Sequence, residues 1–101
     1  HPQQAVARKR MSGGGAIVTA SLDADQSQTY AFCKSLRYFT MAESLGGVES
    51  LVCHPATMTH ASVDPDVKRK LGIDDGLVRF SVGCEDLADL STDLDQALKQ
   101  L

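Results

Sequence analysis

Short runs of β-branched and apolar residues predict the strands of a sheet. Four such runs occur along the chain: 16–22, 37–42, 48–54 and 76–83. The last run, GLVRFSVG, has the clearest alternation, and its period of two separates an apolar face from a second face that carries an arginine. The apolar face holds Val78, Phe80 and Val82, and the other face holds Leu77, Arg79 and Ser81. We expect the apolar face to lie against helices and Arg79 to point away from them.

Helices are predicted before, between and after these strands. Longer segments with good helix formers or helical apolar spacing are 3–11, 27–36 and 85–101. Within the second segment, Phe32 and Leu36 form an apolar pair four residues apart. A shorter helix begins at Pro65, because Asp64 is suited to cap its start and Gly72 to follow its end. The last segment carries a stripe of leucines: Leu87, Leu90, Leu94, Leu98 and Leu101.

These elements predict an α+β fold. Strands and helices are mixed along the chain, which favours a four-stranded, mainly antiparallel sheet with helices on one face. The chain has 101 residues, of which 43% are hydrophobic and 23% are charged. This composition is typical of one globular domain.

Charge and cysteine content narrow the possible partners. The formal net charge of -3 argues against binding to nucleic acid or to an anionic membrane surface. No apolar run approaches the roughly 18 residues that cross a bilayer. The 3 cysteines are an odd number without a CxxC motif, so we expect reduced thiols and a cytoplasmic location. Because the chain begins HPQQAVARKR rather than with Met, we also expect a fragment or a processed chain.

Arg79 is the residue that most suggests a function. It is expected on the rigid backbone of a strand, where a guanidinium can bind a carboxylate or phosphate through two parallel hydrogen bonds. The alternative interpretation is an exposed strand arginine that pairs with Glu49 or with water. The sequence pattern alone leaves both interpretations open.

Two further segments carry polar side chains without a decisive motif. AESLGGVES (42–50) combines a carboxylate, hydroxyls and two glycines, which the pattern alone favours as a turn. HPATMTHAS (54–62) contains two histidines and two threonines, and we interpret it as a loop. A zinc site formed by Cys53, His54 and His60 is conceivable, but this spacing matches no usual tetrahedral pattern.

Longer words of the sequence resemble one enzyme family. These words are HPQQAVARKRMSGGGAIVTASL (1–22), AESLGGVESLVCHPATMTHAS (42–62) and GIDDGLVRFSVGCEDLADL (72–90). They resemble the C-terminal domain of the Cys/Met-metabolism PLP-dependent enzymes, which include cystathionine γ-synthase, cystathionine γ-lyase and methionine γ-lyase. The resemblance covers essentially the whole chain. It implies the small C-terminal domain of a fold-type I PLP-dependent transferase at 15–101, preceded by a linker helix and Gly-rich turn at 1–14.

The resemblance also implies roles for individual residues. Arg79 is expected to bind the α-carboxylate of the substrate, Ser44 and Leu45 to line the same pocket, and Thr59 to support the arginine. The family's Schiff-base lysine belongs to a larger PLP-binding domain that is absent from this chain. We therefore expect no catalytic residue here, pyridoxal 5'-phosphate bound by that larger domain, and no activity from this segment alone.

Glu43 bears on the subfamily that the resemblance implies. An acid at this position is typical of members that act on cystathionine, whose distal ammonium it can attract, whereas methionine γ-lyases usually have an apolar residue. The expected activity is γ-elimination or γ-replacement on cystathionine or an activated homoserine, by a cytoplasmic homotetramer of methionine and cysteine metabolism. γ-Lyase and γ-synthase are not separated by this segment. The competing hypotheses are a non-catalytic amino-acid-binding module of ferredoxin-like type and an inactive, truncated relative.

Overall fold

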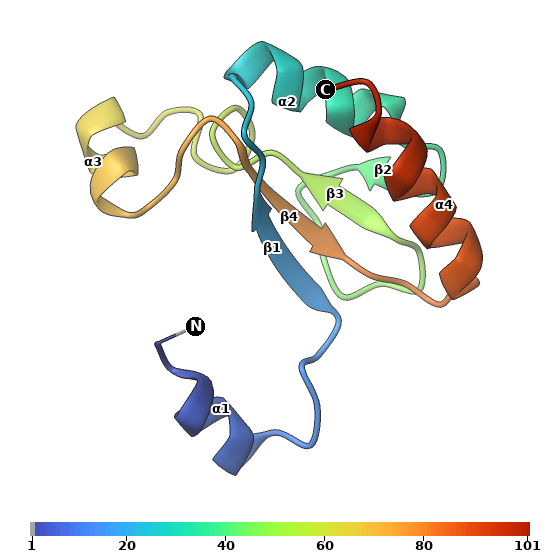
Figure 1. The fold of residues 1–101 in the computed structure, drawn as a ribbon. Coiled ribbons are helices and arrows are strands. Elements are labelled where there is room, and N and C mark those ends of the chain that lie inside the picture. The colour runs from blue at the N-terminus through green and yellow to red at the C-terminus, as the bar shows by residue number, and fades with distance from the viewer. Residues whose placement is uncertain (1) are drawn as a thin grey trace.

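A computed structural model describes residues 2–101 and contains one mixed four-stranded sheet (Figure 1). The strands are β1 (Ile17–Ser21), β2 (Thr40–Met41), β3 (Leu51–Cys53) and β4 (Leu77–Ser81), in the order β1-β4-β3-β2. β4 pairs antiparallel with both β1 and β3, while β2 pairs parallel with β3. The prediction of an α+β fold with a mainly antiparallel sheet is confirmed.

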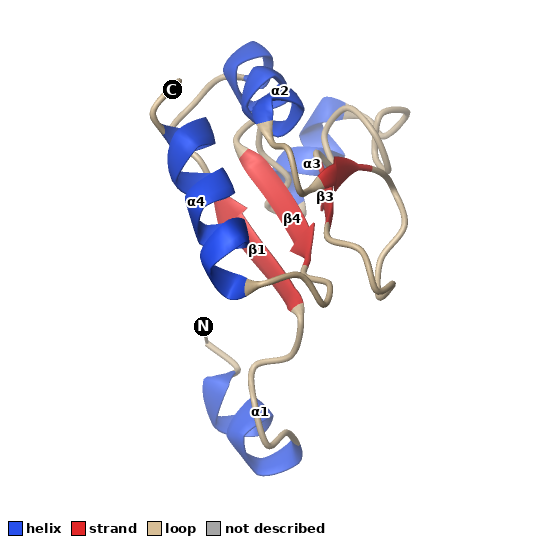
Figure 2. Cartoon of the chain, turned by 90° about the vertical axis from the view of Figure 1, so that its right-hand side faces the viewer, coloured by secondary structure: helices blue, strands red, loops and turns tan. Residues whose placement is uncertain are grey.

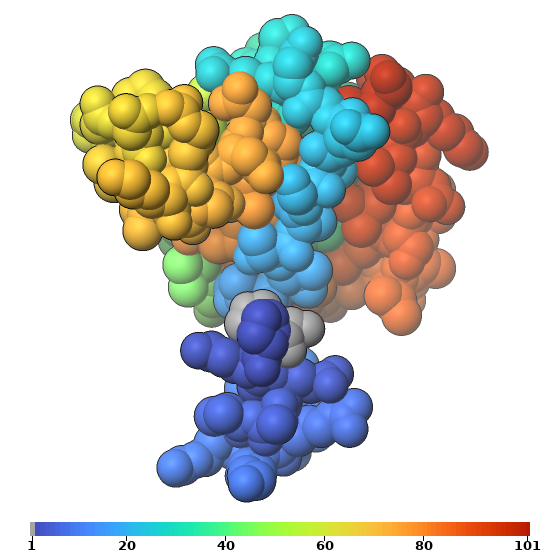
Figure 3. Space-filling view, turned by 60° about the vertical axis from the view of Figure 1, so that its left-hand side comes forward, coloured from blue at the N-terminus to red at the C-terminus, as the bar shows by residue number. Residues whose placement is uncertain are grey.

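The helices are α1 (Gln4–Arg10), α2 (Gln26–Ser35), α3 (Pro65–Lys70) and α4 (Leu87–Leu98). α2 and α4 lie side by side and cover one face of the sheet (Figures 1 and 2). α3 lies beyond one end of the sheet, and α1 stands apart from the sheet and its helices (Figure 3). We call the sheet face opposite α2 and α4 the open face. None of the helices in residues 2–101 has the length and hydrophobicity needed to cross a membrane.

The hydrophobic core lies between the sheet and the two covering helices. Phe80 packs edge-on against Phe32 and Phe39, with ring centroids 6.4 and 5.2 Å apart. Val78 is fully buried and belongs to the same core as Phe80, while Val82 packs against its edge. The predicted apolar face of β4 therefore faces the helices, as its period of two requires.

Local sequence signals set the helix boundaries. Asp25 and Gln28 form a reciprocal capping box at the start of α2. Asp64 caps α3, Pro65 occupies its first turn, and Gly72 follows its end with a φ of 72°. The helix predicted at 3–11 is present and one residue shorter at each end, and the helix predicted at 27–36 is present with both ends one residue earlier.

The leucine stripe predicted for the last helix is only partly correct. Leu90 is buried and Leu94 packs against the core, but the other leucines of the stripe are exposed: Leu87, Leu98 and Leu101. The buried positions of α4 are Leu90, Asp93 and Ala97. The helix therefore turns a different face to the core, one that includes a carboxylate bonded to the turn after α2.

β2 and β3 are shorter than the sequence predicts, because main-chain N–H groups just before them donate to side chains. The main-chain N–H groups of Arg37 and Tyr38 donate to the carboxylate of Asp93 rather than to a neighbouring strand. The N–H of Ser50 donates to Glu85. Both segments are therefore held in irregular conformations beside short strands.

Cys33, Cys53 and Cys84 are free thiols, in agreement with the expected absence of a disulfide framework. Burial has the largest effect on the pKa of Cys33 and the charge of the neighbouring Cys53 has a smaller one, and together they raise this pKa to about 11. This thiol is therefore protonated near neutral pH and acts as a small apolar side chain in the core.

Candidate functional site

Arg79 lies at the middle of β4, on the open face of the sheet. Its neighbours across the sheet are Thr19 of β1 and Cys53 of β3, and it shares its face with Leu77 and Ser81. The side chain is half-buried. A guanidinium held on a central strand is positioned more rigidly than one on a loop, which suits recognition of a fixed ligand group.

The guanidinium of Arg79 is only partly satisfied within the described part of the chain. Its Nη2 donates to the carbonyl oxygen of Glu43 at 2.9 Å and contacts the carbonyl oxygen of Ser44 at 3.4 Å. Its Nε is buried and has no hydrogen-bond partner among residues 2–101. An unpaired buried donor costs about 1–3 kcal/mol. Because Nε is enclosed by protein atoms, a ligand oxygen would reach the guanidinium at its terminal nitrogens, and the alternative pairing with Glu49 is not formed.

The segment 42–50 connects β2 to β3 and lies over the open face. Gly46 donates its N–H to Oγ of Ser81 at 2.8 Å and has a φ of 76°, which favours glycine. Glu43, Ser44 and Leu45 are exposed. The structure thus brings Glu43 and Ser44 to Arg79 through main-chain contacts, with Leu45 next in the chain and the side chains of all three exposed.

The end of this segment is held by Glu85. The carboxylate accepts from the N–H of Ser50 at 2.7 Å and from its hydroxyl at 2.8 Å. These bonds lower the pKa of Glu85 below its usual value, and the bond from the main-chain N–H of Ser50 has the larger effect. Gly83 permits the close approach, since a Cβ there would lie 2.3 Å from the carbonyl oxygen of Val48 and 2.6 Å from the carbonyl carbon of Glu49.

The segment 54–62 has mainly structural contacts. His54 is fully buried, with Nδ1 2.8 Å from Oγ1 of Thr57 and Nε2 2.9 Å from the carbonyl oxygen of Asp75. Both ring nitrogens are thus engaged, which argues against His54 as a zinc ligand. Oγ1 of Thr59 bonds Nδ1 of His60 at 2.8 Å. Thr59 makes this bond rather than one to Arg79, and its supporting role stays a prediction.

Three of the five lysines are placed away from Arg79 or are engaged elsewhere. Lys34 belongs to α2 and lies over the ring of Tyr30, and Lys99 follows α4, so both accompany the helices on the opposite face. The ammonium of Lys68 donates to the carbonyl oxygens of Ala56 and Ala61.

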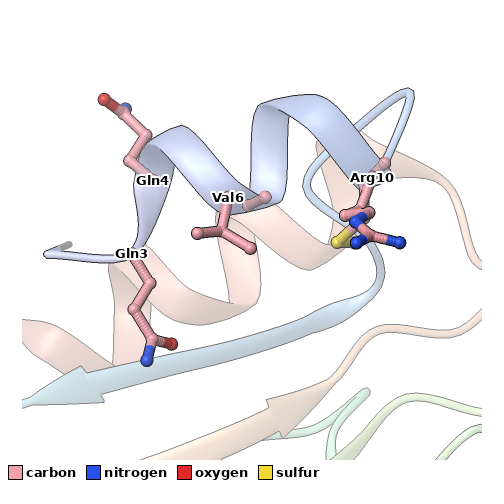
Figure 4. A pocket seen from close by; sticks show the side chains of 6 residues that line it. Gln3, Gln4, Val6 and Arg10 are labelled. Carbon is pink, nitrogen blue, oxygen red and sulfur yellow. The ribbon is translucent and has the colours of Figure 1, made fainter.

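A shallow hollow on α1 is a separate feature (Figure 4), lined by Gln3, Gln4, Val6, Ala7, Arg10 and Met11.

Sequence analysis missed the residues that hold segment 42–50. Ser81 was placed on the same face as Arg79 but given no role, and no role in the site was predicted for Ser50 or Glu85. A usable signal was the presence of short polar side chains on the arginine face of a strand otherwise rich in apolar residues.

Comparisons with known proteins identify close relatives. The model of the family "Cys/Met metabolism PLP-dependent enzyme" matches residues 1–99. The chain is 47% identical over 100 residues to cystathionine beta-lyase of Lactococcus lactis subsp. cremoris (strain MG1363), covering 99% of this chain and 26% of that protein. It is 50% identical over 99 residues to cystathionine gamma-lyase of Mus musculus, covering 98% of this chain and 25% of that protein.

A solved structure of a related enzyme has the same fold over the length of this chain. Cystathionine gamma synthase from Xanthomonas oryzae pv. oryzae, in complex with cystathionine, superimposes with a TM-score of 0.90 at 46% identity. The match covers 99% of this chain and 26% of that chain. This chain therefore spans about a quarter of the length of the relatives it matches.

Proposed function

The chain belongs to the Cys/Met metabolism PLP-dependent enzyme family, and from this premise we propose that it forms the C-terminal part of a transsulfuration enzyme. In this proposal residues 15–101 form the small domain, residues 1–14 lead into it, and a larger domain outside this chain binds PLP. The complete enzyme performs γ-elimination or γ-replacement on cystathionine or an activated homoserine, as a homotetramer. Relatives named cystathionine beta-lyase, gamma-lyase and gamma synthase all support a reaction that involves cystathionine. Their names differ in the position, beta or gamma, and in the reaction, so they do not select one of these activities.

The central role that we propose for this chain is binding of the substrate α-carboxylate by Arg79. The observation that carries it is the guanidinium on the open face of a central strand, where its hydrogen bonds within residues 2–101 run only from Nη2 to two main-chain carbonyl oxygens. A carboxylate bound there accepts from the terminal nitrogens of the guanidinium and forms a charge-assisted pair. Thr59 is proposed to support the arginine when substrate is present.

In this proposal the residues of this chain meet the amino-acid end of the substrate, next to PLP, and do not themselves bind the cofactor. PLP, when bound, supplies the electron sink for chemistry at the substrate Cα. The lysine that binds it is proposed to come from the larger domain, because Lys34 and Lys99 accompany the covering helices and Lys68 is bonded to two carbonyls.

Arg79 contributes orientation as well as affinity. A carboxylate fixed by a planar guanidinium cannot rotate freely about the bond to Cα, so Arg79 also limits how Cα is turned. By fixing the carboxylate, Arg79 would determine which bond of Cα is presented to the cofactor and so would favour loss of the Cα proton over loss of the carboxylate. Ser44 and Leu45 line the same pocket, and Glu43 attracts the distal ammonium of cystathionine.

Replacement of Arg79 tests this proposal in the complete enzyme. Arg79→Ala should lower kcat/KM for cystathionine by about a hundredfold or more, because the substrate carboxylate loses a charged partner. The melting temperature should fall by no more than about 5 °C, since the side chain lies outside the core. Arg79→Lys should restore activity only in part, because an ammonium lacks the planar fork. Steady-state kinetics and thermal melting measure these effects.

Arg69→Ala is the matched control, because Arg69 lies on α3 and pairs with Asp66 at the surface. It should behave as the parent enzyme. Normal turnover by Arg79→Ala, or a large loss of its stability, would contradict the proposed carboxylate site. Amino-acid binding by a parent protein that shows no PLP-dependent turnover would favour the binding-module hypothesis.

A further inference from the structure

Two neighbouring positions on the open face of β4 hold the same segment. Arg79 donates to the carbonyl oxygens of Glu43 and Ser44, and Oγ of Ser81 accepts from the N–H of Gly46 at 2.8 Å. Ser81 is 1% exposed, so its bond to Gly46 is shielded from water. The stretch 43–46 is therefore held at its beginning by one strand residue and at its end by the next residue on that face.

The remainder of the segment is fixed independently. Glu85 holds Ser50 through two hydrogen bonds, and the N–H of Cys84 donates to the carbonyl oxygen of Val48 at 2.8 Å. Loss of the Ser81 bond would thus free the stretch around Gly46 without releasing the connection to β3. The position of Ser44 and Leu45 over the open face, next to Arg79, therefore depends most directly on Ser81.

We propose that Ser81 is a positioning residue for the carboxylate site, acting through the Gly46 amide. The inference rests on the proposed function of Arg79 and deepens it. With the hydroxyl present, the carbonyl groups of residues 43 and 44 hold the guanidinium in one orientation, and Ser44 and Leu45 stay in place beside the bound carboxylate. Without it, the Gly46 N–H loses its acceptor, and the segment samples positions in which these contacts are broken.

This role predicts a particular kinetic pattern. In this proposal segment 42–50 lies beside the carboxylate and the distal ammonium of the substrate, groups whose own bonds do not change, so their binding is much the same before and during the reaction. A looser segment should therefore weaken substrate binding more than it slows turnover. A residue that only stabilises the fold would lower the melting temperature and leave KM unchanged.

The test uses Ser81→Ala in the complete enzyme, with Ser21→Ala as the matched control. Ser21 lies on the same face at the opposite end of the sheet and bonds Asp74. We expect Ser81→Ala to raise KM for cystathionine about five- to fiftyfold and to change kcat by less than about threefold. Hydrogen exchange, followed by mass spectrometry, should become faster in a peptide that covers 43–47. Ser81→Cys, with a weakly accepting sulfur, should lie between the parent and Ser81→Ala.

Each outcome decides the inference. Parent-like exchange at 43–47 in Ser81→Ala would mean that Ser81 does not hold the segment, and faster exchange with a parent-like KM would mean that substrate binding does not depend on its position. Either result overturns the inference. Failure of the proposed function has a separate signature, because Arg79→Ala would then bind and turn over cystathionine as well as the parent enzyme does.

Discussion

At the scale of single residues, Glu43 contributes to the site in two separable ways. Its carbonyl oxygen accepts from Arg79, while its side chain is exposed at the start of segment 42–50. A substitution changes the side chain and leaves the carbonyl in place. The charge can therefore be tested without removing the contact that orients Arg79.

Glu43→Val should shift substrate choice in the complete enzyme. We expect kcat/KM for cystathionine to fall more than kcat/KM for methionine or homocysteine, by between a few-fold and roughly a hundredfold, depending on how far the contact is desolvated. Glu43→Gln keeps the size of the side chain and removes the charge, so it should show most of the same shift. Equal losses on every substrate, measured by steady-state kinetics, would assign Glu43 to the fold or to the general chemistry instead.

The sequence predicts the direction of Arg79 because a strand period of two depends only on local geometry. The same rule places Ser81 on the open face, but it cannot say what the hydroxyl touches. Its partner is a main-chain N–H, and Arg79 bonds main-chain carbonyls, so neither contact is specified by a residue type. Both depend on the path of segment 42–50, which is fixed by contacts distant in sequence.

At the scale of elements, a carboxylate of α4 holds the turn that follows α2. Asp93 is 3% exposed and accepts from the N–H groups of Arg37 at 2.9 Å and Tyr38 at 2.8 Å. Burial alone would raise the pKa of Asp93, but the hydrogen bonds from Tyr38, Arg37 and the Gln96 side chain outweigh it and lower the pKa. The charged carboxylate thus joins α4 to the turn between α2 and β2.

Asp93→Asn should lower the free energy of unfolding by about 1–3 kcal/mol at neutral pH. Because the pKa of Asp93 is lower in the folded protein, its contribution is fully present above the unfolded pKa of roughly 3.9 and is lost as the pH falls through the folded pKa. The difference between parent and variant should therefore shrink below about pH 4. Urea unfolding at several pH values measures it.

Asp95→Asn is the matched control, since Asp95 lies on the same helix and is exposed. A difference between parent and Asp93→Asn that stays constant down to low pH would contradict the assigned role of the charge.

Helix boundaries were predicted well because caps act locally, as Asp64 and Gly72 show for α3. The face that α4 buries was predicted only in part. Leucine spacing favoured a stripe through Leu87 and Leu98, but the contact with the turn after α2 turns Asp93 inward. A buried carboxylate that caps another element leaves no periodic signal in its own helix.

At the scale of the whole molecule, the chain carries a candidate substrate site, and none of its lysines has a proposed cofactor role. We predict that this chain alone, treated with PLP and then borohydride, gains no single stoichiometric pyridoxyl-lysine. The complete enzyme under the same treatment should be labelled at one lysine outside this segment. Peptide mapping distinguishes the two, and one dominant labelled lysine among Lys9, Lys34, Lys68, Lys70 and Lys99 would overturn the prediction.

Sheet topology was the part of the fold least accessible from sequence patterns. The four strands could be located from composition, but their order could not, because β1 and β4 pair across most of the chain. The parallel pairing of β2 with β3 across segment 42–50 was likewise not encoded in the Gly-Gly pattern. Strand pairing is decided by packing between distant segments, which local periodicity does not record.

β4 is both the central strand of the sheet and the last strand along the chain. During synthesis the ribosome therefore releases β1 and β3 before the strand that joins them has been made. Until residue 81 has emerged, both strands present free hydrogen-bonding edges, which can pair with other extended chains. The nascent chain completes its sheet only near the end of this segment, and its exposure to aggregation lasts until that moment.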